Sequence, residues 1–213
     1  MDVRLLGRWT NNPWLDMTSA VRDINTAFSS MVDAHELDME FGIPRLPTKV
    51  DPWEEGEIPS SRCRLDRDVA RALAELESSV QSALLRPAAQ TKNFIWAMAG
   101  DGEIVIAIEE IAPKAYNDSP RVPNGYPRRK GLDHPVEKKK LGHPTLLDGG
   151  HARIAGEIAF DRNPKDGRLV WMLNANSGRY CAENPPSARQ VDNVAERFVK
   201  LGLTVTVDYM DAE

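Results

Sequence analysis

Two amphipathic helices are predicted in the first half of the chain. Apolar side chains recur at helical spacing from about Ser19 to Leu37 and from about Leu65 to Leu85. Between them, four prolines within residues 43–62 break any helix and cannot donate to a β-ladder. We therefore expect an ordered connector on the domain surface, anchored by Trp53. A peptide-docking segment is the alternative for the same residues.

Two β-hairpins are predicted in the second half. The apolar stretches Asn93–Ala99 and Glu103–Glu109 flank Gly100-Asp101-Gly102, which is typical of a tight hairpin turn. Arg153–Phe160 and Arg168–Leu173 form a second strand pair around a polar turn.

A helix and a last strand are predicted to follow. Ser187 and Gln190 have the spacing of a capping box, and Gly202 stands where a helix ends in the left-handed conformation. Leu203 to Tyr209 then alternate between apolar and polar residues, as in a half-buried strand.

These elements predict a single α+β domain over residues 1–213. Residues 1–90 would be its helical part and residues 91–213 its sheet-rich part. The sheet would be mainly antiparallel, made of the two hairpins and the C-terminal strand. Helices near residues 19–37, 65–85 and 187–202 are expected to cover it.

The segment from 113 to 150 has no periodicity and is rich in proline. Between Arg121 and Gly142 it carries seven Lys or Arg residues against Asp133 and Glu137. Long structureless insertions are usually functional or solvated loops. The basic stretch Arg121 to Lys140 is therefore either a flexible loop or a lid that contacts an anionic ligand or partner.

Composition narrows the class of protein. The net charge of -5 argues against general binding to nucleic-acid backbones. Two distant cysteines, Cys63 and Cys181, make neither a zinc site nor a disulfide framework, so no metal is expected. No apolar run has the length of a membrane span, and the N-terminus lacks the pattern of a signal peptide. A cytoplasmic protein is expected, or one delivered into a target cell.

Three short segments carry residues suited to chemistry. The first is a glycine-rich loop from Gly142 to His151, which holds His143, Thr145 and Asp148. The second is Ala155-Gly156-Glu157, where a glycine within a strand indicates a bulge or a close approach by backbone or ligand. The third is the run from Asn174 to Tyr180, with amides, a hydroxyl, a guanidinium and a phenol.

The order of these segments resembles a module that reads His-Ser-Ser-Leu, Ala-Gly-Glu and Ser-Gly-His-Tyr. That module is found in plant IQ-motif calmodulin-binding proteins and in C-terminal domains of bacterial Rhs-type polymorphic toxins. The similarity covers about the last 70 residues. Arg179 stands where the module has histidine, and Cys181 to Asn184 are inserted before Pro185. Arginine stays protonated, so acid–base work at this position is not expected.

The first functional hypothesis is a binding protein of the toxin, effector or immunity class. It would act on a protein partner through a cleft near residues 142–180, with Glu157 at its floor. Ser177, Gly178 and Tyr180 would form a structural turn. Arg179 would pair with Glu157 or Glu183. The candidate ligand-binding residues are Thr145, Asn176, Ser177, Gly178 and Arg179.

The second hypothesis is an ADP-ribosyltransferase-like toxin or effector that uses NAD. His143 or Arg179 would hold the dinucleotide, and Tyr180 would stack on its nicotinamide ring. Glu157 or Glu183 would steady the oxocarbenium-like centre. The candidate catalytic residues are Glu157, His143 and Tyr180.

The third hypothesis is a hydrolase. Ser177 or Cys181 would be the nucleophile and His143 the base, with Asp148 or Glu157 to orient it. Ser177 does not lie on a Gly-x-Ser-x-Gly elbow.

Overall fold

The structure is a computed structural model of the chain, and it describes residues 33–80, 84–113, 125–128 and 138–209. The chain divides into two compact units, residues 1–36 and 37–213, and the fold below is that of the second. Most of the predicted helix from Ser19 to Leu37 lies outside the described residues, as does most of the basic stretch from Arg121 to Lys140.

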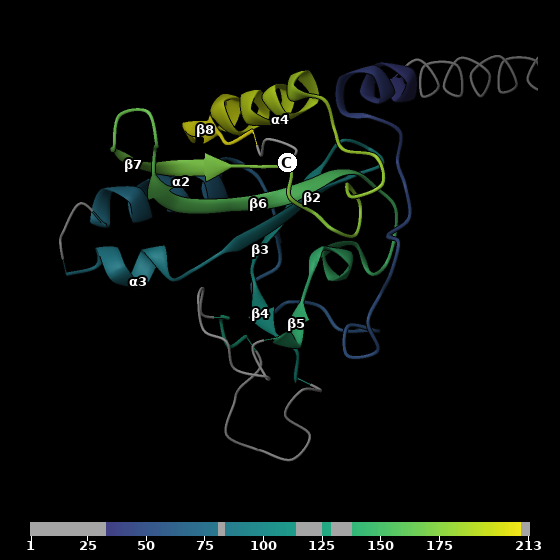
Figure 1. Cartoon of the computed structure of the whole chain (residues 1–213), viewed down its shortest axis with the longest axis horizontal. Helices are drawn as coiled ribbons and strands as arrows, with labels where there is room; N and C mark the ends of the chain where they lie inside the picture. Colours follow the sequence, from purple (N-terminus) through teal and green to yellow (C-terminus); the bar gives the residue numbers. More distant parts are fainter. Residues whose placement is uncertain (1–32, 81–83, 114–124, 129–137, 210–213) are drawn as a thin grey trace, which may run out of the picture. The chain divides into compact units, whose positions relative to one another are not determined.

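A six-stranded sheet forms the centre of the larger unit, in the order β1-β3-β2-β6-β7-β8 (Figure 1). All neighbouring strands are antiparallel except β7 and β8. The predicted α+β class with a mainly antiparallel sheet is therefore confirmed. The strands are β1 Cys63–Arg64, β2 Phe94–Ala99, β3 Ile104–Ile108, β6 Ala152–Arg162, β7 Leu169–Leu173 and β8 Val205–Val207.

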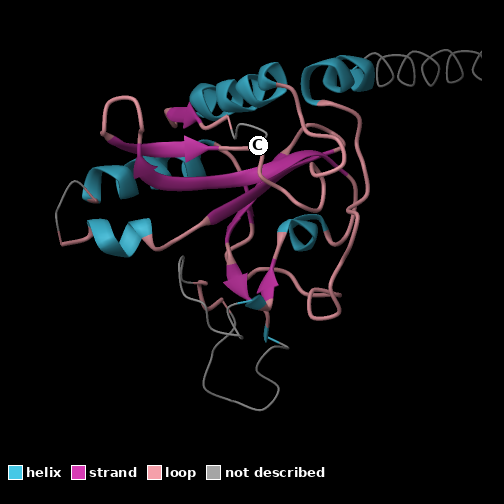
Figure 2. Cartoon of the chain, in the orientation of Figure 1, coloured by secondary structure: helices cyan, strands magenta, loops and turns pink. Residues whose placement is uncertain are grey.

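Both predicted hairpins are present, as β2–β3 and β6–β7. The two hairpins join through β2 and β6, where Trp96 lies opposite Gly156. The last strand, β8, pairs in parallel with β7 because α4, Ala188–Leu201, carries the chain back between them. Helices, strands and loops are distinguished in Figure 2.

Local signals fix the ends of α4. Ser187 and Gln190 form the predicted capping box, and Gly202 ends the helix at a φ of 102°. The predicted helix from Leu65 to Leu85 is shorter than expected. Asp66 caps its start, so α2 spans Arg67–Ser79. Pro87 lies in the first turn of α3, Arg86–Gln90, where its missing N–H is not needed.

The core lies between the sheet and the helices. Trp96 of β2 meets Phe198 of α4 edge to face, with ring centroids 6.4 Å apart. Trp171 of β7 contacts Phe94 and Phe160 in the same manner. Burial of each such ring stabilises the fold by roughly 2–3 kcal/mol.

The opposite face of the sheet is covered by a short 3-10 helix that the sequence did not reveal. Ile95 points to this face because side chains alternate along a strand. The helix, η3 His143–Leu147, packs against β2, β3 and β6. A two-stranded sheet lies beside it, made of β4 Glu110–Ile111 and β5 Lys140–Leu141. Elements of two to five residues show no periodicity, so this part of the 113–150 segment escaped prediction.

The N-terminal end of the described chain is helical over residues 33–41, and Gly42 follows at a φ of 89°. The connector over residues 43–62 is irregular, as predicted. It is not confined to the surface, because Asp51 and Glu54 are buried. Within the described ranges, none of the helices has the length and hydropathy needed to cross a membrane.

Candidate functional site

The three segments singled out in the sequence meet in space. The Tyr180 hydroxyl donates to the Gly150 carbonyl at 2.7 Å, and the His143 ring nitrogen Nε2 donates to the Gly156 carbonyl at 2.9 Å. The Cys181 thiol contacts the Ala155 carbonyl at 3.3 Å. In each contact a side chain of one segment meets a backbone carbonyl of another, so the three segments are held together.

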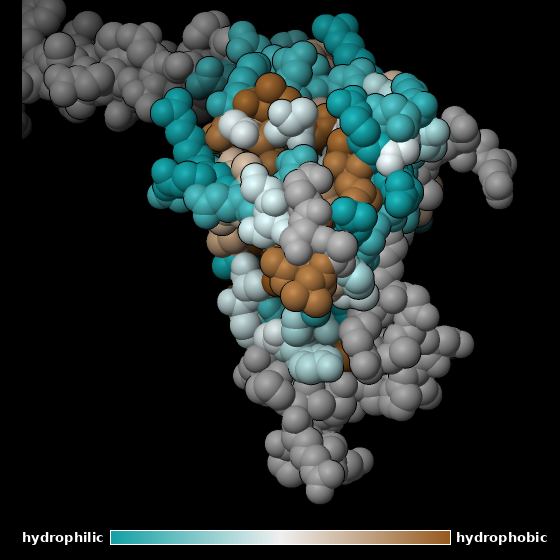
Figure 3. Space-filling view, turned by 90° about the vertical axis from the view of Figure 1, so that its left-hand side faces the viewer, coloured by the Kyte–Doolittle hydropathy of each residue, from teal (hydrophilic) through white to brown (hydrophobic). Residues whose placement is uncertain are grey.

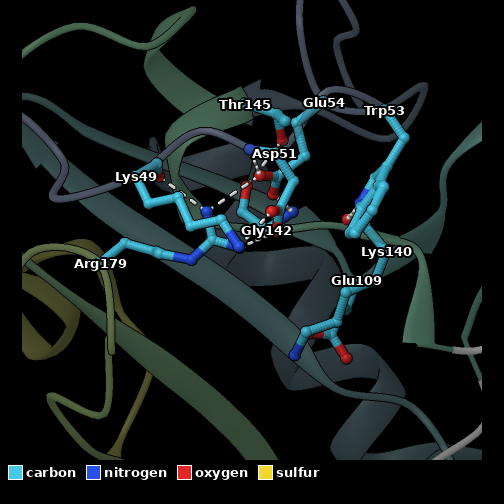
Figure 4. Close-up of polar contacts among 9 residues, drawn as sticks. All are labelled: Lys49, Asp51, Trp53, Glu54, Glu109, Lys140, Gly142, Thr145 and Arg179. Atoms are coloured by element: carbon cyan, nitrogen blue, oxygen red, sulfur yellow. Dashed lines mark hydrogen bonds and ion pairs between the residues drawn. The ribbon is translucent and has the colours of Figure 1, made fainter.

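Arg179 is held by carboxylates of the connector (Figure 4). Its Nη2 lies 2.5 Å from Asp51 Oδ2 and its Nη1 lies 3.0 Å from Glu54 Oε2. Nη1 also donates to the Lys49 carbonyl at 2.7 Å. We call Arg179, Lys49, Asp51, Glu54 and the Gly142 amide the Arg179 clamp. The prediction that Arg179 pairs with Glu157 or Glu183 is wrong, because the connector brings the carboxylates of Asp51 and Glu54 to the guanidinium.

Each remaining oxygen of the clamp also has a partner. Glu54 accepts from the backbone amides of Asp51, at 2.8 Å, and Gly142, at 2.9 Å. Lys49 Nζ lies 2.5 Å from Asp51 Oδ1. Burial alone would raise the pKa of Asp51, but Lys49 and Arg179 outweigh it and hold the pKa below its usual value. The two carboxylates of the clamp are buried, with side-chain exposures of 1% for Glu54 and 8% for Asp51, while Arg179 is partly exposed, at 25%, and Lys49 is exposed.

His143 is placed as a structural residue. It lies in η3 and is buried, and this burial lowers the pKa of its imidazole to about 4. The ring is therefore neutral near pH 7, with its proton on the nitrogen that faces Gly156. Thr145, two residues further, is also buried, and its hydroxyl donates to the Gly142 carbonyl at 2.7 Å.

Tyr180 and Cys181 are likewise built into the fold. Burial raises the pKa of both the phenol and the thiol, so neither is activated as a nucleophile or base. Ser177 is buried, and within the described residues its hydroxyl has no hydrogen-bond partner. Asn176 and Gly178, by contrast, are exposed.

Glu157 is half-buried on β6. Its backbone amide donates to the Asn174 side chain at 3.1 Å, and its carbonyl accepts from the Asn174 amide at 3.0 Å. The neighbouring Gly156 is where the backbone approaches closely, as the sequence indicated. A Cβ on Gly156 would lie 2.0 Å from the Asn174 carbonyl oxygen.

A second buried carboxylate pair was missed by sequence reasoning. Glu109 pairs with Arg128, at 2.8 Å, and with Lys140. Its neighbour Glu110 accepts from the backbone amides of Ser60 and Ser61, each at 2.8 Å. The Trp53 indole donates to the Lys140 carbonyl at 3.3 Å, which attaches the connector near this pair.

Two hollows flank these segments. A partly open groove of about 510 Å³ lies against Ala175 to Gly178, and a smaller hollow of about 260 Å³ lies against η3 and residues 54–57. Neither is lined by both the 142–151 loop and the 176–180 turn, and neither is lined by Glu157. No group of three or more His, Cys, Asp or Glu in the described part of the chain could hold a metal ion.

Asp51 and Glu54 are the residues of this region that sequence reasoning did not find. They lie in Asp51-Pro52-Trp53-Glu54, within the proline-rich connector. Carboxylates beside an aromatic residue in an ordered connector were the available signal, but nothing in the spacing shows that they face Arg179, which follows 125 residues after Glu54. Comparison of the chain with protein-family models, with curated proteins and with solved structures gives no match.

Proposed function

We propose that this chain is a binding protein of the toxin, effector or immunity class, which recognises a protein partner without catalysis. One observation carries the proposal: the side chains best suited to chemistry are committed to the fold. Arg179 is occupied by Asp51 and Glu54, His143 by Gly156, and the Tyr180 hydroxyl by Gly150. Groups held in this manner stabilise a scaffold, while an acid–base or nucleophilic site needs groups free to reach a substrate.

The contacts also argue against the hydrolase hypothesis. A nucleophile and its base must lie within hydrogen-bond reach of each other. Among the described residues neither candidate nucleophile is bonded to His143, because the Ser177 hydroxyl has no partner and the Cys181 thiol contacts the Ala155 carbonyl. A raised thiol pKa makes Cys181 a poor nucleophile at neutral pH.

The transferase hypothesis is tested by incubating purified chain with labelled NAD and bacterial lysate, comparing wild type with Glu157→Ala. The proposal expects no label on lysate proteins and no difference between the two. Transfer of label that disappears in Glu157→Ala would show an enzyme and overturn the proposal.

Expression in bacteria supplies the second arm. The proposal expects the wild-type chain to be harmless, and an immunity role additionally expects protection of cells that express a toxin from the same source. Toxicity relieved by Glu157→Ala would again contradict a non-catalytic function.

A further inference from the structure

We propose that the groove at the carboxyl ends of β7 and β8 is the docking site, and that it takes a segment of a protein partner with an aromatic or large aliphatic side chain beside a lysine or arginine. This inference rests on the proposed binding function and names the surface and the chemistry of the partner. The lining residues come from the segments that follow β7 and β8 and from the start of α4.

The topology places the groove where ligands bind in parallel sheets. The strands β7 and β8 are parallel and joined through α4, so both carboxyl ends open at the same edge. In open parallel α/β sheets, ligands bind outside the carboxyl ends of the strands, and the groove lies at the corresponding end of this pair. Figure 1 shows α4 and β8 beside β7 at the top of the domain. This is the one parallel pair in the described sheet.

The groove has the size and the walls of a preformed site. Its volume of about 510 Å³ lies within the range of roughly 300–1,000 Å³ usual for ligand sites. Pro185 and Pro186 form part of the wall, with Ala182 and Ala188. Prolines have a fixed φ, so this part of the wall loses little conformational entropy when a partner binds. Small side chains leave room for a large one.

The charge of the groove indicates which residue of the partner lies next to the inserted side chain. Asp208 is exposed and is the one charged residue among those that line the groove in the described chain. The charged residues next to the lining residues are of both signs and do not line the groove themselves: Glu183, Asp192, Arg189 and Arg45, which donates to the Asn184 carbonyl at 3.3 Å. The charge inside the groove is therefore that of Asp208, which a lysine or arginine next to the inserted side chain complements.

A second hollow, of about 540 Å³, lies against Ala195 and Val199, but it is more open than the groove and is lined by residues of α4 alone. Figure 3 shows hydrophobic atoms as separate patches among hydrophilic ones on one face of the molecule. Scattered apolar side chains are normal on folded domains and need no partner. The large exposed apolar side chains that do not line the groove are, in the described chain, Met39, Ile43, Leu46, Ile58, Leu84, Leu85 and Val199.

The test measures fluorescence polarisation with labelled short peptides on the full chain. The probes are a peptide with a central Lys-Leu-Trp-Lys, the same peptide with Glu-Leu-Trp-Glu, and one with Lys-Ser-Ser-Lys. We expect saturable binding of the first and at least about tenfold weaker binding of the other two. No saturable binding of the first, or equal binding of all three, overturns the proposal.

Two groove variants and one control locate the site. Ala182→Trp fills the groove from an exposed position and is expected to weaken binding at least about tenfold. Asp208→Lys is expected to weaken the cationic peptide about fivefold and to favour the acidic one. Glu75→Lys, on the exposed side of α2, makes the same kind of charge change outside the groove and should change affinity less than about twofold. Circular dichroism and urea unfolding confirm that each variant is folded.

Equal binding by wild type and Ala182→Trp would overturn the proposal, because the peptide would then bind elsewhere.

Sedimentation over a range of concentrations tests a second copy as the occupant. Self-association lost in Ala182→Trp would assign the groove to that copy. Removal of residues 210–213 tests the chain's own end, and peptide binding seen only after removal would assign the groove to it. Either result contradicts a partner segment. If the peptides do not bind and no label is transferred from NAD, the docking site is wrong, but the proposed non-catalytic function still holds.

Discussion

The Arg179 clamp and the β7–β8 groove share the turn from 176 to 181, but they differ in charge and in how accessible they are to a ligand. The clamp contains four charged side chains, and its carboxylates and guanidinium are paired with one another. Half of the residues that line the groove are alanine, proline or glycine, and the groove is partly open. The residues that look reactive in the sequence therefore hold the fold, while residues with little chemistry form the accessible surface.

The largest effect should come from breaking the clamp. Arg179→Met leaves the buried Glu54 without a cation and Asp51 with Lys49 alone, so the free energy of unfolding should fall by about 3 kcal/mol in urea denaturation. Arg71→Met removes a surface pair with Asp68 and serves as the control, with a change of at most about 0.5 kcal/mol. Equal effects of the two variants would mean that the clamp is solvated and is free to bind a ligand.

Substitution of Gly156 should lower the free energy of unfolding nearly as much. Gly156→Ala puts a methyl group against the Asn174 carbonyl, and we expect a loss of about 3 kcal/mol in the free energy of unfolding. Gly178→Ala is the matched change in the groove, where an added Cβ meets nothing within 4 Å. It should change stability by less than about 1 kcal/mol. A neutral Gly156→Ala would contradict the closed packing of these segments.

Burial of His143 predicts a pH dependence. Its pKa is about 4 in the folded chain against an ordinary value of 6.5, so the unfolded chain binds the extra proton first as pH falls. Stability should therefore be full above pH 6.5 and decrease by up to about 3 kcal/mol towards pH 4. Urea unfolding at pH 7 and pH 5 measures this loss.

His143→Gln keeps an amide donor for Gly156 and removes the titration, so much of the loss between pH 7 and pH 5 should disappear. His151→Gln changes an exposed histidine and should leave the loss unchanged. A pH dependence identical in wild type and His143→Gln would show that His143 is accessible to protons, as a catalytic base would be.

The smallest expected effect belongs to the groove. Ser177→Ala removes a buried hydroxyl without a partner in the described chain, so stability should be unchanged or higher by up to about 1 kcal/mol. Urea unfolding measures it. A loss above about 1 kcal/mol would show that the hydroxyl serves the fold in the same manner as the clamp.

Periodicity and capping residues were enough to predict most of the helices and strands. They did not predict which polar side chains pair over long distances in the chain. The hairpins β2–β3 and β6–β7 and the caps of α4 rest on local signals and were predicted. The η3 turn is too short for a pattern. The partners of Arg179 lie 125 and 128 residues away, and their choice depends on how the connector crosses the domain. Gly156 was recognised because a glycine in a strand has a steric meaning wherever its neighbour comes from.

The central claim is that Arg179 serves the fold as a cation for buried carboxylates. A double-mutant cycle on the free energy of unfolding tests it most directly, with Arg179→Met, Glu54→Gln and the double variant. If the two side chains stabilise each other inside the clamp, the double variant should lose less than the sum of the single losses, by at least about 1.5 kcal/mol. Losses that add within about 0.5 kcal/mol would contradict the claim and return Arg179 to the candidates for ligand binding.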